Sequence, residues 1–86
     1  MNECVGVDVS KQHLDWVFGG EGKVKRVNNT PAGIRGLVAK LRRCEASLII
    51  VESTGGYERA IGEALAKADL PVVYVVETFR TRGVFF

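Results

Sequence analysis

Hydrophobic and polar residues alternate along the first third of the chain, as they do in strands that bury one face. Cys4–Val9 and His13–Phe18 both show this alternation, and each is long enough for a strand. Lys23–Val27 mixes lysines with valines, a pattern typical of a half-exposed edge strand. Gly19–Gly22 supplies the residues of a hairpin loop between the second and third segments. The pattern predicts three antiparallel strands.

The spacing then changes to that of a helix. Thr30 can cap a helix that begins at Pro31, and Arg42 and Arg43 suit its C-terminal end. Apolar residues recur at i, i+3, i+4 and i+7, which gives the helix one apolar stripe. The stripe consists of Ile34, Leu37, Val38 and Leu41. Close packing against the sheet would explain the glycines at 33 and 36.

Two continuous apolar runs, Leu48–Val51 and Val72–Val76, predict buried strands. Between them, Tyr57–Ala68 predicts a second helix, whose inner face is Ala60, Ile61, Ala64, Leu65 and Ala68. The order is therefore strand, strand, strand, helix, strand, helix, strand, with parallel pairing between helix-linked strands. This is the order of the ribonuclease H fold, an α/β fold with a mixed sheet, in which the first strand lies centrally beside the fourth.

The composition indicates a folded chain but names no partner. At 86 residues, with 47% apolar and 26% charged residues, residues 1–86 fit one domain. A net charge of +2 gives no overall electrostatic reason for binding nucleic acid. Cys4 and Cys44 have no metal-ligand spacing and read as two buried thiols of a reducing compartment. No signal peptide is visible and the apolar runs are too short to span a bilayer, so we expect a cytoplasmic protein.

Two carboxylates stand where the predicted strands end. Asp8 lies near the end of the first strand, and Glu52 directly follows Leu48–Val51. Ligands of open α/β sheets bind outside the carboxyl ends of the strands, and the predicted order brings these two side chains to one spot. Taken singly, Asp8 also fits a turn before Ser10, and Glu52 also fits the start of a loop. Gly6 shares the face of Asp8 and leaves space beside it.

The residues after Glu52 allow two interpretations. Ser53, Thr54, Gly55 and Gly56 fit a helix cap with a flexible turn, or an anion site that holds a DNA phosphate. Both stay open at this point, and Glu58 suits the first helical turn. Asp15 could lie near the carboxylate pair, but the uncertain turn before it leaves its side of the sheet open. His13 and Trp16 fit sheet packing better than ligand binding.

Four segments together resemble the N-terminal part of the DEDD transposases. They are Val5–Lys11, Leu14–Asp15, Asn29–Ile34 and Val51–Glu58, in the family's order and spacing. The family comprises bacterial insertion-sequence transposases and the related pilin-gene-inverting recombinases. Its catalytic domain is similar to the Holliday-junction resolvase RuvC. The resemblance covers roughly residues 4–76 and supports the ribonuclease H-like fold.

The resemblance implies a DNA-recombining enzyme whose four acidic residues bind divalent cations, usually Mg²⁺ (or Mn²⁺). Asp8 would be the first of these and Glu52 the second. The last two aspartates belong to a later helix, and residues 77–86 contain no Asp. We therefore expect a C-terminally truncated catalytic domain that binds metal weakly and is inactive alone. DNA is the implied partner, and some family members add a guide RNA.

Two other classes of function remain open on the sequence. An actin-like or sugar-kinase-like ATPase opens with a similar strand and aspartate, but normally has a glycine two residues after it, where this chain has Ser10. A non-catalytic module that dimerises or binds nucleic acid is the other class. The apolar end Val84–Phe86 favours this module, because exposed apolar groups often mark an interface between copies.

Overall fold

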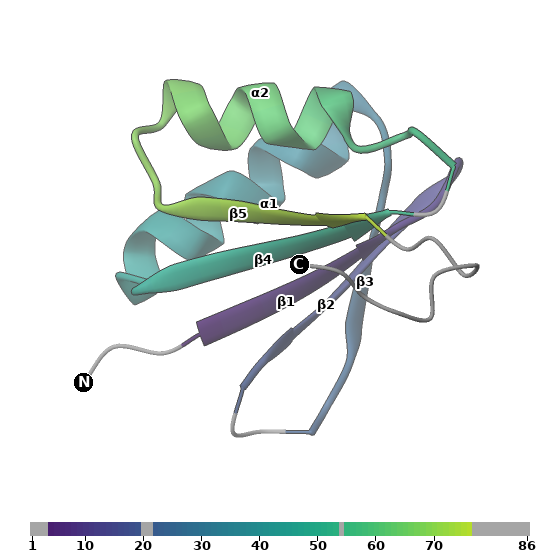
Figure 1. The fold of residues 1–86 in the computed structure, drawn as a ribbon. Helices are drawn as coiled ribbons and strands as arrows, with labels where there is room; N and C mark the ends of the chain where they lie inside the picture. The colour runs from purple at the N-terminus through teal and green to yellow at the C-terminus, as the bar shows by residue number, and fades with distance from the viewer. Residues whose placement is uncertain (1–3, 20–21, 54, 77–86) are drawn as a thin grey trace.

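The computed structural model describes residues 4–19, 22–53 and 55–76. Its elements follow the predicted order (Figure 1). They are β1 (Cys4–Val9), β2 (His13–Phe18), β3 (Lys25–Asn28), α1 (Pro31–Cys44), β4 (Leu48–Ser53), α2 (Arg59–Lys67) and β5 (Val72–Val76). The strands form one sheet in the order β3-β2-β1-β4-β5.

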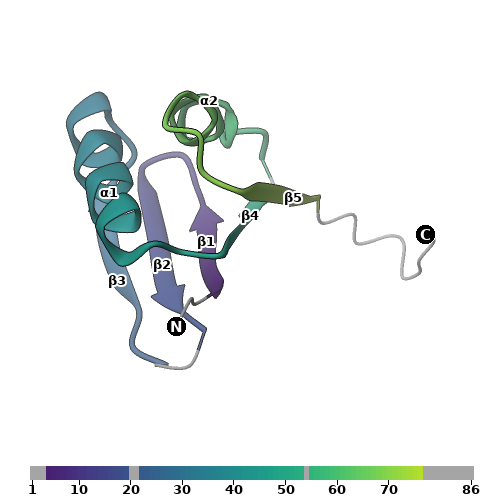
Figure 2. The same cartoon turned by 90° about the vertical axis from the view of Figure 1, so that its left-hand side faces the viewer.

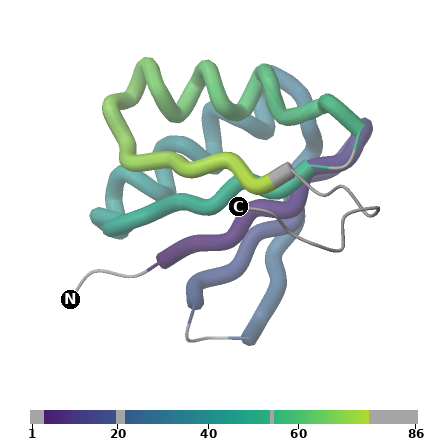
Figure 3. The backbone as a smooth tube through the Cα atoms, in the orientation of Figure 1, coloured from purple at the N-terminus to yellow at the C-terminus, as the bar shows by residue number. Residues whose placement is uncertain are grey.

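The sheet is mixed, and its first strand is central. β1 pairs antiparallel with β2 and parallel with β4, while β5 joins the far side of β4 in parallel. Both helices cover the same face of the sheet, α1 over the side of β3 and α2 over the side of β5 (Figure 2). The tube in Figure 3 shows α2 running back along β4 and β5. The predicted fold class, strand order and central position of β1 are confirmed.

The core lies between this face and the helices. Alternation along the strands sends the valines of β1 and the residues Leu14, Trp16, Ile49 and Val51 to the helix side, where each is at most 3% exposed. The stripes of α1 and α2 meet them there: Ile34, Leu37, Leu41, Ile61 and Leu65. In contrast, the opposite face of the sheet has no helix on it among the described residues and keeps its polar side chains in water.

The start of α1 is fixed as the sequence predicts. Thr30 is the N-cap, and its Oγ1 accepts a hydrogen bond from the amide of Gly33 at 3.1 Å. A side chain at Gly33 would collide with the carbonyl oxygen of Asn28, because the helix begins so close to the end of β3. Nothing lies near the corresponding position of Gly36. Close packing therefore accounts for the first glycine and not for the second.

Three expectations need correction. β5 is an edge strand in the described part of the chain rather than a buried one, and Val73 and Val75 are 45% and 43% exposed. Both Cys4 and Cys44 are exposed free thiols. The second helix begins at Arg59, two residues later than predicted, and leaves Ala60 exposed. The apolar end at residues 84–86 lies outside the described residues.

Candidate metal-binding site

The open face of the sheet carries three carboxylates in one transverse row. Asp8 on β1 pairs in register with Glu52 on β4 and with Asp15 on β2. Hydrogen-bonded strands lie about 4.8 Å apart, so residues in register hold neighbouring positions on the same face. The predicted juxtaposition of Asp8 and Glu52 is confirmed. The position of Asp15, which the sequence left open, is beside Asp8.

The row borders an open hollow of about 400 Å³. Gly6 and Ile50 form its floor two residues below Asp8 and Glu52, and Val17 and Val24 form a wall. Because Gly6 has no side chain, the middle of the floor is low. A Cβ at this position would lie 3.9 Å from Val17 Cγ1, which is ordinary contact, so a small side chain would fit and would take up part of the hollow.

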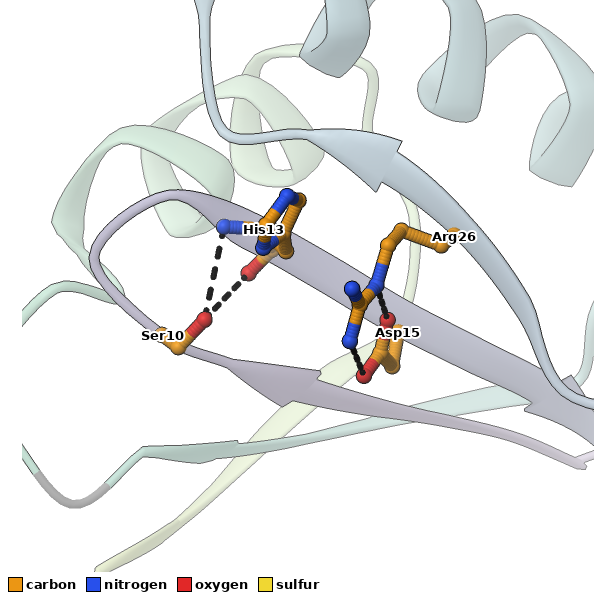
Figure 4. A network of polar contacts seen from close by, with 4 residues as sticks. All are labelled: Ser10, His13, Asp15 and Arg26. Atoms are coloured by element: carbon orange, nitrogen blue, oxygen red, sulfur yellow. Dashed lines mark hydrogen bonds and ion pairs between the residues drawn. The ribbon is translucent and has the colours of Figure 1, made fainter.

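Asp15 is held by an arginine from the neighbouring strand (Figure 4). Arg26 on β3 donates from Nε to Oδ1 at 2.7 Å and from Nη2 to Oδ2 at 3.1 Å, a bidentate pair. This hydrogen bonding lowers the pKa of Asp15 below its ordinary value of 3.8, with a smaller contribution from the charges of Arg26 and His13. The same contact raises the pKa of Arg26. Asp15 is therefore ionised and engaged next to Asp8.

The turn between β1 and β2 fixes the spacing of Asp8 and Asp15. Ser10 Oγ donates to the carbonyl of His13 at 3.1 Å and accepts from the His13 amide at 3.3 Å (Figure 4). Asn29 donates from Nδ2 to the Ser10 carbonyl at 3.0 Å and from its amide to Gln12 at 2.9 Å. The segment that leads into α1 thus holds the turn and, with it, the register of the two aspartates.

The donor set fits a hard cation only in part. Asp8 and Glu52 offer exposed carboxylate oxygens, the ligands that Mg²⁺ and Mn²⁺ prefer. Their strands are rigid parts of the central sheet. Among the described residues, however, no group of three or more acidic, histidine or cysteine side chains is close enough to share one ion. The two carboxylates in register therefore fit a partial coordination shell that leaves positions for water and phosphate.

The loop after Glu52 differs from the helix cap that its residues suggest. Ser53 is the last residue of β4, is buried on the helix side, and its Oγ has no hydrogen-bond partner among the described residues. The N-cap of α2 is Glu58, which makes no side-chain cap. Gly56 has a φ of 80° and turns the chain. Ser53 is thus no cap, Thr54 lies outside the described residues, and the anion site at 53–56 stays a prediction.

The sequence alone did not predict the ion pair between Arg26 and Asp15. The available signal was the alternation of β3, which puts Arg26 and Val24 on one face and Lys25 and Val27 on the other. To infer the partner of Arg26 from this alternation, one also needs the pairing register of β2 with β3. The hairpin loop between these strands sets the register, and the sequence does not define the geometry of that loop. The ion pair could therefore be read only from the structure.

The strand order, the helices on one face and the acidic row define a ribonuclease H-like fold, the class of many nucleases. Among solved structures, the chain is similar to RuvC from Thermus thermophilus, with a TM-score of 0.53 and 20% identity. The match covers 86% of this chain and 61% of that one. This likeness concerns the fold, and the chain spans less than two thirds of the RuvC chain.

The family follows from the sequence match. The model of the IS110-type DEDD transposases, described as "Transposase", matches residues 5–82, and the chain belongs to this family. The resemblance inferred from the four segments is thereby confirmed. A comparison with curated proteins gave no match. Within the described residues, no helix is both long and apolar enough to span a membrane.

Proposed function

We propose that this chain carries half of the metal site of a DNA transposase or site-specific recombinase. Asp8 and Glu52 would hold a divalent cation, Mg²⁺ or Mn²⁺, for phosphodiester cleavage and strand transfer. The observation that carries the proposal is the register of Asp8 with Glu52 on adjacent parallel strands, at the edge of a hollow open to solvent. Family membership supports DNA as the substrate.

The chemistry needs what these strands offer. A cation held by Asp8 and Glu52 would polarise a phosphoryl oxygen and would make a bound water easier to deprotonate, which is the chemistry that phosphodiester cleavage needs. Asp8 and Glu52 would orient the ion through rigid backbone, and their mutual repulsion would be relieved by its charge. The hollow beside them gives a phosphate room to approach. Asp15 is held in its ion pair with Arg26 and would not serve as a ligand of the ion.

We further propose that the two carboxylates alone bind metal weakly and that residues 1–86 alone are inactive. Mg²⁺ sites built from few carboxylates are completed by water and substrate phosphates. The other two acidic residues implied by the family would have to come from outside residues 4–76. DNA, a guide RNA and a second copy of the chain are the proposed partners of the complete enzyme, and a cytoplasmic location is proposed with them.

A Mn²⁺ titration followed by NMR tests the metal site. Paramagnetic broadening of the backbone amides should centre on residues 7–9 and 51–53. Asp8→Asn and Glu52→Gln should each weaken binding by about tenfold or more, because each removes a charged ligand from a two-ligand site. Glu63→Gln removes an exposed carboxylate from α2, and broadening should be unchanged in this control.

Thermal unfolding of the same variants separates lost ligands from lost structure. Asp8 lies between two other carboxylates of the row, so neutralising it should leave the midpoint unchanged or raise it slightly. Broadening that is spread over all acidic residues, or that survives in both Asp8→Asn and Glu52→Gln, would refute the proposed site.

A further inference from the structure

A second hollow lies on the other side of the sheet, under the C-terminal end of α1. Its volume is about 390 Å³, at the lower end of the range for small-ligand pockets, roughly 300–1,000 Å³. It is lined by Trp16, Phe18, Lys25, Lys40, Arg43 and Cys44. Phe18 pairs with Val5, at the end of the sheet opposite Asp8. Trp16 also borders the hollow beside the carboxylate row, but the charged residues that line this second hollow, which we call the basic hollow, lie on the other face of the sheet.

Its floor is an aromatic pair and its rim is cationic. Trp16 and Phe18 meet edge to face with ring centroids 5.5 Å apart. Lys25 Nζ lies 5.1 Å from the Trp16 centroid and 5.5 Å from that of Phe18, and Lys40 Nζ lies 6.0 Å from Trp16. Two ammonium groups from β3 and α1 thus share one indole ring. Arg43, one turn beyond Lys40, adds a third positive charge.

This arrangement favours an anion. Lys40 and Arg43 bring two positive charges from one helical turn to the rim of the hollow, whose described lining residues include no carboxylate. Their mutual repulsion would fall if a negative group entered between them. An aromatic floor ringed by Lys and Arg suits a ligand that joins phosphates to flat rings.

We propose that the basic hollow binds the sugar-phosphate backbone of a single-stranded nucleic acid. Lys25, Lys40 and Arg43 would contact phosphate oxygens, and the partly exposed ring of Phe18 would contact a base or sugar. The hollow lies on the helix-covered side of the sheet, away from the proposed metal site. The nucleic-acid strand bound in the basic hollow would therefore differ from the DNA strand that is cleaved at the proposed metal site of Asp8 and Glu52.

Binding of fluorescein-labelled oligothymidylate and oligouridylate, followed by anisotropy in EDTA, tests this site. Lys40→Glu and Arg43→Glu should each weaken binding by about tenfold or more and should flatten its salt dependence. Arg42→Glu is the matched control, because Arg42 is exposed in the same helical turn and does not line the hollow. It has the same change in net charge and in interaction with the helix dipole, and should bind nearly as the wild type does.

The alkylation rates of the two free thiols show where the oligonucleotide binds. Cys44 lines the hollow and Cys4 is exposed on β1 outside it. A bound oligonucleotide should slow the alkylation of Cys44 by iodoacetamide, read by mass spectrometry, and should leave the rate at Cys4 unchanged. The fluorescence of Trp16, the only tryptophan in the sequence, should change with the same midpoint as the anisotropy.

Binding of either oligonucleotide with this pattern supports the proposal, and the tighter one identifies DNA or RNA as the source of the strand. Equal weakening by Arg42→Glu would show diffuse attraction to net charge and would overturn it. Binding of neither oligonucleotide, or equal binding of polyglutamate, would also overturn it. Asp8→Asn should bind as the wild type does, because the assay needs no metal; loss of binding there would move the strand to the carboxylate row and refute the assignment.

Discussion

The two faces of the sheet carry opposite charge, and the same strand serves both. On β2, Asp15 faces the open side and joins the acidic row, while its neighbour Trp16 faces the helices and forms the floor of the basic hollow. On β3, Arg26 faces the open side, where it pairs with Asp15, and Lys25 faces the basic hollow. The period of two in a strand therefore sends residues that are neighbours in the sequence to different sites. A net charge of +2 therefore hides two strongly charged sites.

The two faces also differ in what holds them together. The core between the sheet and the helices is dry, and its apolar side chains are at most 7% exposed. On the open side, the described contacts of the carboxylate row are backbone register and one ion pair, both in contact with water. Stability should therefore depend on the helix side, and metal chemistry on the open side. Paired substitutions on neighbouring residues test this division directly.

The largest effect is expected where neighbouring isoleucines of β4 face opposite ways. Ile49 is fully buried against the helices, and Ile50 lines the open hollow. Ile49→Ala should lower the free energy of unfolding by about 2–5 kcal/mol, since it leaves a cavity in the core. Ile50→Ala should cost about 1 kcal/mol, mainly through lower strand propensity. Urea unfolding followed by circular dichroism measures both.

Equal losses for the two alanine variants would mean that the open face is packed as firmly as the core. If Ile49→Ala is unfolded without urea, the comparison still holds, because Ile50→Ala should remain folded under the same conditions. In that case, the free energy of unfolding of Ile50→Ala is a lower limit on the difference in stability between the two variants.

A smaller effect is expected from the two glycines of α1. Gly33→Ala would push a methyl group into the carbonyl of Asn28 and should destabilise the fold by roughly 1–3 kcal/mol. Gly36→Ala meets open space and should stabilise the helix by up to about 1 kcal/mol, since alanine is the better helix former. Thermal unfolding midpoints should therefore move in opposite directions. A fall in both would show that α1 needs Gly36 for a reason other than packing.

Much of the fold could be predicted because its signals are local. The alternation in β1 and β2, the cap at Thr30 and the apolar stripe of α1 each depend on residues within one element, and each is confirmed. The juxtaposition of Asp8 with Glu52 needed only the order of the strands. Once β1 and β4 are predicted to be adjacent, these two residues, which are distant in the sequence, are predicted to be neighbours. The pairing of Asp8 with Glu52 could therefore be predicted from the sequence.

The rest depended on information that a single segment does not contain. A continuous apolar run such as Val72–Val76 reads alike in a central strand and at an edge, so the exposure of β5 was missed. The side taken by Asp15 follows from the turn at residues 10–13, and the Arg26 pair follows from a hairpin register. The basic hollow joins β2, β3 and α1. None of these could be read before the elements were assembled.

The smallest expected effect lies in the pH dependence of the Asp15–Arg26 pair. Arg26 lowers the pKa of Asp15, so the ionised carboxylate favours the folded state. This contribution is fully present above the ordinary value of 3.8 and is lost as the pH falls through the lower folded-state pKa. The difference in stability between wild type and Asp15→Asn should therefore shrink on acidification through this range. Urea unfolding at a series of pH values measures it.

Arg26→Gln shows whether the arginine is the cause. In this variant the carboxyl carbon of Asp15, followed by NMR, should titrate closer to its ordinary pKa, because the bidentate hydrogen bonds are gone. The double variant Asp15→Asn, Arg26→Gln should lose the pH-dependent difference entirely. An unchanged titration of Asp15 in Arg26→Gln would mean that Arg26 does not hold this carboxylate in solution. Asp15 would then be free to turn toward Asp8 and Glu52, and the division between a structural carboxylate and the proposed metal-binding carboxylates on the open face would fail.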